Sequence, residues 1–258
     1  IVAWPRKKME TGKKGLLAES SLALDYRYFW SVTILRFVTL FFLFCVAIAM
    51  YFYPGGNIHD PNQLGYSFTH NFLSDLGGYT ARSGDQNFLS SFFFNMAVFC
   101  FSAVGVSFLF VPQLFIGDQL GHRLAIAGSC FFVLGMVFFA GVGLTPYDLY
   151  TDLHIFFALN AFRLLVPGAF LYVIVIYRSP LKNSFTLITI AYLVSVTGYV
   201  IYQLTSGSAL DSEVEMVNQA SIQKVIVLVS IVSTFSLSYA FSSQFKIIKK
   251  RRHAHGAS

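Results

Sequence analysis

Residues 31–53, with the sequence SVTILRFVTLFFLFCVAIAMYFY, form an apolar run that contains a single charged residue, Arg36. At a rise of about 1.5 Å per residue, a helix of this length crosses the roughly 30 Å hydrocarbon core of a bilayer. Five similar runs follow, at about 88–111, 122–144, 155–177, 184–204 and 222–245. The sequence therefore predicts an all-α, polytopic integral membrane protein built as a bundle of six transmembrane helices.

The overall composition agrees with this prediction. Of the 258 residues, 55% are hydrophobic and 12% are charged, and a soluble domain carries about twice that charged fraction. The apolar runs lack the alternating pattern of barrel strands, so helices are expected. The formal net charge of +6 has no soluble basic domain to carry it, which argues against nucleic acid as a partner.

The distribution of Lys and Arg predicts the orientation. With six spans, both termini lie on one side of the membrane. That side holds fourteen basic residues: Arg6, Lys7, Lys8, Lys13, Lys14, Arg27, Arg123, Arg178, Lys182, Lys246, Lys249, Lys250, Arg251 and Arg252. The opposite side holds Arg82 and Lys224. The positive-inside rule therefore predicts that both termini are cytoplasmic, and that a prokaryotic source would place the chain in the plasma (inner) membrane.

Three parts of the chain follow from this topology. Residues 1–30 are expected to form a basic cytoplasmic leader, because no apolar segment and cleavage site of a signal peptide is present. Residues 31–245 form the transmembrane domain. Residues 246–258 form a basic cytoplasmic tail that anchors the topology.

Two outer connections contain unusual residues. Residues 54–87 form a long loop with several glycines and prolines, and a loop of this length is more often functional than a simple connector. The second connection, residues 145–152, is short and rich in aromatic and acidic side chains. We expect these two connections to lie close together at the same face of the bundle.

Eight polar residues on or near the outer side are the candidates for ligand binding: Ser74, Asp75, Asn95, Asp148, Asp152, His154, Asn160 and Arg163. Ionisable residues inside a span are costly, so Arg163, eight residues into its run, needs a partner. Candidate partners are Asp75, Asp148, Asp152, Asn95 or a lipid phosphate. Arg163 then forms either a structural ion pair or an anion-binding group.

Histidines also lie on the outer side. His59, His70 and His154, together with the nearby carboxylates, have the chemistry of a divalent metal site. No pair of them shows the close spacing typical of zinc ligands. We therefore predict no metal site and no cofactor, with metal binding kept as the alternative.

Short motifs in this region carry a resemblance to a known family. They are Asn71-Phe72-Leu73-Ser74-Asp75-Leu76-Gly77-Gly78, Phe94-Asn95, and Thr145-Pro146-Tyr147-Asp148 followed by His154. They resemble the DUF998 family of multi-span membrane proteins. More distantly, they resemble the Frag/DRAM/Sfk group, six-span proteins linked to autophagy, lipid asymmetry and lipid-anchor remodelling. The resemblance covers about residues 31–245 and implies a six-span fold, although the spacing between Gly77 and Phe94 is longer than in the commoner form.

The motif also has a physical interpretation of its own. Ser74 or Asp75 can cap a short turn, and Gly77 and Gly78 permit a backbone conformation that side chains would hinder. Asp75 is then expected to point toward Arg163 or His154. This arrangement serves as a structural latch that holds the loop over the bundle, as a ligand-capture site, or as part of a catalytic site.

The favoured function is a non-enzymatic one. It is an integral membrane protein with a polar outer-leaflet pocket that interacts with membrane lipids or acts as an accessory subunit to other membrane proteins. The main alternative is a membrane-embedded lipid hydrolase or transferase, with or without a metal ion. A transporter is less favoured because the inner halves of the spans hold no acidic residue. A structural subunit of a larger membrane complex is a further alternative.

Overall fold

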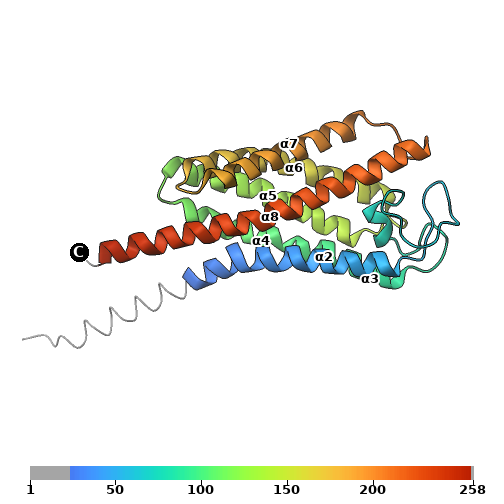
Figure 1. The fold of residues 1–258 in the computed structure, drawn as a ribbon, viewed down its shortest axis with the longest axis horizontal. Coiled ribbons are helices and arrows are strands. Elements are labelled where there is room, and N and C mark those ends of the chain that lie inside the picture. Colours follow the sequence, from blue (N-terminus) through green and yellow to red (C-terminus); the bar gives the residue numbers. More distant parts are fainter. Residues whose placement is uncertain (1–23, 257–258) are drawn as a thin grey trace, which may run out of the picture.

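The computed structural model describes residues 24–256, with side chains from residue 24 to 251, and it is entirely helical apart from its loops (Figure 1). Six helices are long and apolar enough to cross a membrane: Leu24–Phe52, Phe88–Phe115, Gln119–Leu144, Thr151–Arg178, Asn183–Thr205 and Glu213–Arg251. The prediction of an all-α bundle with six spans is confirmed. Most of the expected leader, residues 1–23, lies outside the described residues.

The spans divide into the following elements. A π-helical segment, Phe29–Ile34, leads into α2 (Leu35–Phe52). The second span is α3 (Phe88–Phe101), α4 (Ala103–Phe110) and a 3-10 turn, Val111–Phe115. The remaining spans are α5 (Gln119–Leu144), α6 (Thr151–Arg178), α7 (Asn183–Thr205) and α8 (Glu213–Gly256).

The second span is interrupted where the sequence predicts a continuous helix. The Ser102 hydroxyl donates to the backbone carbonyl of Phe99 at 2.6 Å. A serine that bonds the carbonyl of the preceding turn competes with the helical ladder and often bends the helix. The break therefore separates α3 from α4 at Ser102.

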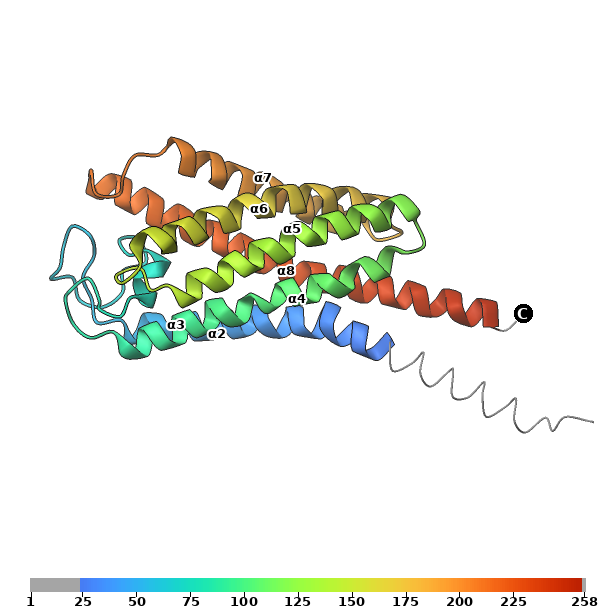
Figure 2. The same cartoon turned by 180° about the vertical axis from the view of Figure 1, so that it is seen from behind.

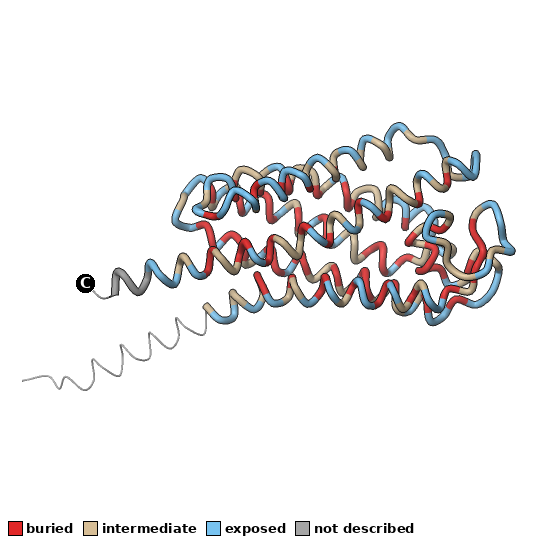
Figure 3. Tube along the Cα trace, in the orientation of Figure 1, coloured by how far each residue is buried: buried red, intermediate tan, exposed pale blue. Residues whose placement is uncertain are grey.

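The helices form a closed ring. α2 packs against α3 and α8, α5 packs against α3, α4 and α6, and α7 lies between α6 and α8. Figure 2 shows α5 between α4 and α6. Buried positions recur along the inward faces of these helices, whereas α7 is exposed over much of its length (Figure 3). The core is therefore a bundle interior lined mainly by aromatic and aliphatic side chains.

The two ends of the bundle differ. The first and last described residues lie at one end, which we call the terminal end, and α8 extends beyond the other helices there (Figure 1). At the opposite end, residues 54–87 fold back over the helices, and we call this segment the lid. The lid contains a short 3-10 helix, η2 (Leu73–Gly77). Which end faces the cytoplasm stays a prediction from the charge distribution.

Candidate functional site

A buried carboxylate organises the lid. Asp75 is 1% exposed, and its Oδ1 accepts a hydrogen bond from the Nε of Arg82 at 3.0 Å. Its Oδ2 accepts from the backbone N–H of Phe72 at 2.9 Å and from the side-chain amide of Asn71 at 3.2 Å. Both oxygens therefore face donors, as a buried charge requires.

Asn71 connects this carboxylate to the rest of the lid. Its Nδ2 also donates to the carbonyl of Gly56 at 2.7 Å, and its Oδ1 accepts from Gln63 Nε2 at 2.7 Å and from the Ser67 N–H at 2.9 Å. The side chain is fully buried. Two segments of the lid that are distant in sequence are thus held together by one amide group.

The lid is also attached to α3. The side chains of Ser91 and Asn95 donate to the carbonyl of Gly77 at 3.0 and 2.9 Å, and Ser90 donates to the carbonyl of Leu76 at 3.1 Å. Gly77 is required by this close approach, since a Cβ there would lie 2.7 Å from Asn95 Oδ1. The Ser-Asp-Leu-Gly-Gly motif therefore has a structural reason in this fold.

The expectation that residues 54–87 and 145–152 lie close together is confirmed. Asp148 accepts from the backbone N–H groups of Tyr79 and Thr80 at 2.9 and 2.8 Å. The Arg82 guanidinium lies 4.3 Å from the centroid of the Tyr147 ring, within the range of a cation–π interaction. The loop between α5 and α6 is thus joined to the lid by a carboxylate and an aromatic ring.

The ionisation of this region follows from its burial and charges. Burial raises the pKa of the Tyr53 hydroxyl, and the Asp75 carboxylate raises it further. Burial lowers the pKa of Arg82, but the charge and hydrogen bond of Asp75, together with the nearby Tyr147 and Tyr53, outweigh burial, so that the pKa is raised overall. Arg82 is therefore cationic throughout the physiological range, and Tyr53 keeps the proton that it donates to the Gly56 carbonyl.

The expected contact between Asp75 and Arg163 or His154 is wrong. Asp75 is paired with Arg82, which is seven residues away in the same loop. His154 instead bonds the Thr145 carbonyl through its Nδ1 at 2.6 Å, and Arg163 lies exposed on α6. Of its candidate partners in this chain, Asp75, Asp148 and Asn95 are bonded elsewhere, and no ion pair joins Arg163 to the exposed Asp152 among the described residues.

The eight predicted residues thus separate into two groups. Ser74, Asp75, Asn95, Asp148 and His154 lie at the lid end, in or against the lid and the loop between α5 and α6. Asp152 is exposed in the first turn of α6. Asn160 donates to the Phe156 carbonyl of its own helix at 2.8 Å. Asp152, Asn160 and Arg163 do not join the lid cluster.

Lys224 is a residue of this region that the sequence analysis missed. It was counted as an outer-side topological charge, but it lies within α8 and is 5% exposed. Its Nζ donates to the carbonyl of Asn71, and to that of Ala220 at 2.9 Å. The rings of Tyr66 and Phe68 lie 5.7 and 5.4 Å from it. The sequence feature that could have indicated its burial is its position two residues inside the apolar run 222–245.

The two histidines of the lid, His59 and His70, have separate partners. His59 Nε2 lies 2.9 Å from the carbonyl of Ala209, and His70 Nε2 lies 3.3 Å from Glu213. Within the described part of the chain, no three His, Cys, Asp or Glu side chains are grouped as metal ligands would be. Both histidines instead connect the lid to the α7–α8 loop and to the start of α8.

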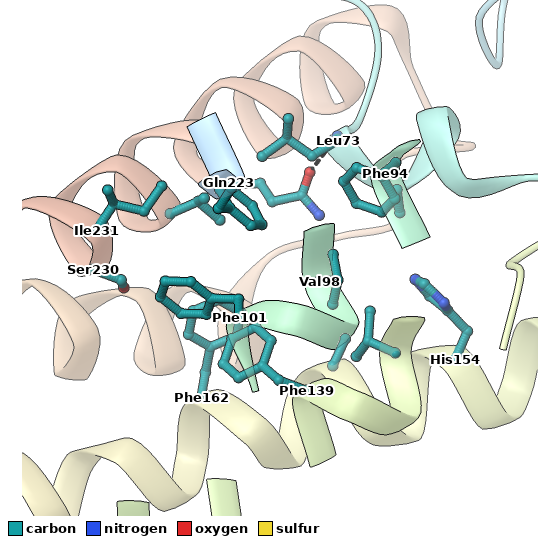
Figure 4. Close-up of a pocket in the computed structure, with 15 residues that line it drawn as sticks. Leu73, Phe94, Val98, Phe101, Phe139, His154, Phe162, Gln223, Ser230 and Ile231 are labelled. Atoms are coloured by element: carbon teal, nitrogen blue, oxygen red, sulfur yellow. Dashed lines mark hydrogen bonds between the residues drawn. The ribbon is translucent and has the colours of Figure 1, made fainter. Parts of the chain in front are cut away.

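A cavity of about 70 Å³ lies in the bundle beneath η2. Its walls are apolar and aromatic, and Figure 4 shows His154 from α6 and Gln223 from α8 among the labelled residues that line it. The lining residues are Phe42, Leu73, Ser74, Phe94, Val98, Phe101, Phe139, Val142, His154, Ala158, Phe162, Gln223, Val227, Ser230 and Ile231. Gln223 is fixed by the Leu73 N–H, which donates to its Oε1 at 2.8 Å (Figure 4).

A second, more polar space adjoins this cavity. It is a cleft of about 360 Å³ between the lid, α6, α7 and α8, and its lining includes Arg82, Tyr147, Tyr202, Gln203 and Gln219. Four residues line both spaces: Ser74, His154, Ala158 and Gln223. The two spaces therefore adjoin at these four residues, which we call the neck, with aromatic walls on one side and hydrogen-bonding groups on the other.

Several polar atoms of the cleft and its neck have no partner among the described residues. Arg82 bonds Asp75 through Nε, which leaves its Nη1 and Nη2 groups without a hydrogen bond there. Gln203 Oε1 is buried and likewise lacks a hydrogen bond. His154 uses Nδ1 for the Thr145 carbonyl, so its Nε2 is open to a ligand. The Arg82 N–H groups can donate to an anionic oxygen, whereas Gln203 Oε1 and the neutral His154 Nε2 can accept a hydrogen bond from a hydroxyl or N–H group.

Comparisons with known proteins give no relative for this chain. No family model matches it, and neither a curated protein nor a solved structure is detectably similar. The resemblance to the DUF998 family therefore receives no support from them. The six long apolar helices and their packing establish a multi-span, helical integral membrane protein.

Proposed function

We propose that this protein binds a membrane lipid or a lipid-like amphiphile without chemical conversion. The observation that carries the proposal is the junction of the two spaces, because an apolar cavity and a polar cleft share Ser74, His154, Ala158 and Gln223. Such a junction fits a molecule with an apolar chain and a polar head. The cleft has the volume typical of small-molecule sites, roughly 300–1,000 Å³.

The cavity suits the end of an apolar chain. Its volume of about 70 Å³ is half that of an engineered apolar cavity, roughly 150 Å³, which stays dry and binds benzene. It therefore accommodates the last few methylene groups of a chain, and the remainder occupies the neck and the cleft. The Phe101, Phe139 and Phe162 rings supply the apolar contacts.

The cleft suits the head group. Among the described residues that line it, Arg82 carries the one fixed charge, and its Nη groups offer the two-pronged geometry that matches a phosphate or carboxylate. The amide groups of Gln203 and Gln219 add neutral hydrogen-bonding positions. A head group with a single anionic centre and neighbouring polar atoms is therefore favoured.

Substitution of Ala158 by tryptophan tests this proposal. Ala158 lies at the neck, so an indole ring there closes the path between the cleft and the cavity. We expect photo-cross-linking by a phosphatidylglycerol with a diazirine at the end of one acyl chain to fall at least fivefold at Val98 and Phe101. Labelled peptides are quantified by mass spectrometry after reconstitution into phosphatidylcholine vesicles.

Leu134→Trp is the matched control, because Leu134 is exposed on the outer face of α5. This variant adds the same ring to the surface of the bundle, and cavity labelling is expected to stay at the wild-type level. Labelling of the wild-type protein that is confined to outward-facing residues of the helices would refute the proposal.

A further inference from the structure

Arg163 is an exposed cation near the middle of α6. At 1.5 Å per residue it lies about 18 Å along the axis from Thr151 and about 22 Å from Arg178. Its side chain is exposed, and no hydrogen bond or ion pair engages it within residues 24–251. An arginine at this depth is costly in hydrocarbon, and intramembrane arginines are normally paired or face a protein interior.

The other intramembrane arginine shows how this bundle satisfies such a group. Arg36 on α2 donates from Nε to the Ser238 hydroxyl of α8 at 3.1 Å, and its guanidinium lies 4.3 Å from the Tyr239 ring. That cation is covered by a neighbouring helix. Arg163 has the same side chain and no such cover from the described residues.

The face of α6 that carries Arg163 has the pattern of a helix interface. Phe156, Arg163, Phe170 and Tyr177 follow one another at intervals of seven residues, and all four are exposed. A seven-residue repeat keeps one stripe of a helix against a partner helix in a left-handed pair. The stripe therefore has the geometry that a single additional transmembrane helix requires.

The neighbouring helix supports the same conclusion independently. In the 18-residue apolar stretch that makes α7 a candidate span, 22% of the residues are buried. The corresponding stretch of every other candidate span is at least 39% buried. Figure 3 shows this side of the bundle with few buried positions. Among the candidate spans, α7 is thus the least covered by the rest of the bundle, and it packs beside α6.

From this arrangement we infer that the α6 stripe binds a transmembrane helix of another protein that carries a carboxylate at the depth of Arg163. A second copy of this chain does not supply that group. Every Asp and Glu of the sequence lies in a loop, in the leader or near the end of an apolar run, and none lies at mid-span. Two copies paired through α6 would instead bring two unpaired arginines into the same region.

A synthetic transmembrane helix serves as the probe. We use a leucine-rich peptide of membrane-spanning length with one central aspartate, and a control peptide with leucine at that position. Each is reconstituted with the full chain in phosphatidylcholine vesicles, and association is measured by energy transfer between a dye on the peptide and a dye on the protein. We expect the aspartate peptide to associate at least tenfold more strongly than the leucine peptide.

Variants assign this preference to Arg163. Arg163→Leu is expected to remove the preference, since the side chain faces outward and its loss leaves the bundle packing unchanged. Arg163→Lys keeps the charge and retains part of the preference. Arg36→Gln, at the covered arginine, leaves it intact. Equal association of the two peptides with the wild-type protein would overturn the inference, as expected if lipid phosphates satisfy Arg163. An aspartate preference that persists in Arg163→Leu would also overturn it.

Discussion

Replacement of Asp75 by asparagine is expected to destabilise the lid by about 3 kcal/mol, the lower end of the range for breaking a buried ion pair from one side. Both carboxylate oxygens accept hydrogen bonds from N–H donors. The NH2 group of the new asparagine must therefore face one of these donors, and it cannot accept a hydrogen bond from it. Arg82 also loses its counter-charge. The lower end applies because the Arg82 side chain is 30% exposed and regains some hydration.

The measurement is amide hydrogen exchange in the lid. If the lid opens locally, a loss of about 3 kcal/mol speeds exchange of its protected amides by roughly a hundredfold. The Asn71 and Ala81 amides are suitable reporters, because each is bonded to a carbonyl within the lid. Amides in the middle of α5 are expected to exchange at the wild-type rate.

Asp85→Asn is the matched control. Asp85 belongs to the same loop and undergoes the same chemical change, but its exposed side chain bonds Ser83 at the surface. Exchange in this variant is expected to stay within a few-fold of the wild-type rate. Similar exchange in the Asp75 and Asp85 variants would show that the buried carboxylate does not hold the lid closed.

Hydropathy predicted the number of membrane-spanning helices, but not where the helices end or break. Apolar runs locate the part of each helix that is compatible with lipid, and all six were found. They do not locate the helix ends, so the start of the first span at Leu24 and the 44-residue length of α8 were missed. They also do not reveal a local break such as the one at Ser102, which depends on one side-chain hydrogen bond.

The lid was harder to predict, since a loop has no periodicity to define its contacts. The sequence indicated that Asp75 and Asp148 were candidates for a polar cluster. It did not indicate that Arg82, assigned to topology alone, would pair with Asp75. Lys224 was missed for a related reason: it was counted only as a charge on the side opposite the termini, whereas it is buried and bonds a carbonyl of the lid.

Substitution of Gly143 by alanine adds one methyl group inside the bundle, and we expect it to affect both the helix packing and the lid. In the structure α5 lies close to α3 at Gly143, where a Cβ would lie 2.9 Å from the Asn95 carbonyl oxygen and 3.0 Å from the Phe99 nitrogen. These are backbone atoms and cannot rotate away. Gly143→Ala is therefore expected to lower the free energy of unfolding by about 2 kcal/mol, as overpacking does.

Gly198→Ala makes the same substitution in α7, where a Cβ meets no atom within 4 Å. There the gain in helix propensity is expected to raise the free energy of unfolding by up to about 1 kcal/mol. Unfolding in mixed micelles with increasing denaturing detergent measures both variants. Changes of the same sign would contradict the close approach of α5 to α3.

The position of Gly143 also gives the substitution a second, local effect. The methyl group pushes on the backbone of Asn95, whose side chain holds the Gly77 carbonyl of the lid. Displacement of α3 therefore weakens the attachment of η2, and the Gly78 amide, bonded to the Asp75 carbonyl, is expected to exchange faster in Gly143→Ala. Gly198→Ala is expected to leave that amide unchanged because a Cβ at Gly198 meets no atom within 4 Å. Faster exchange at Gly78 in the first variant alone would show that helix packing and lid closure are mechanically linked.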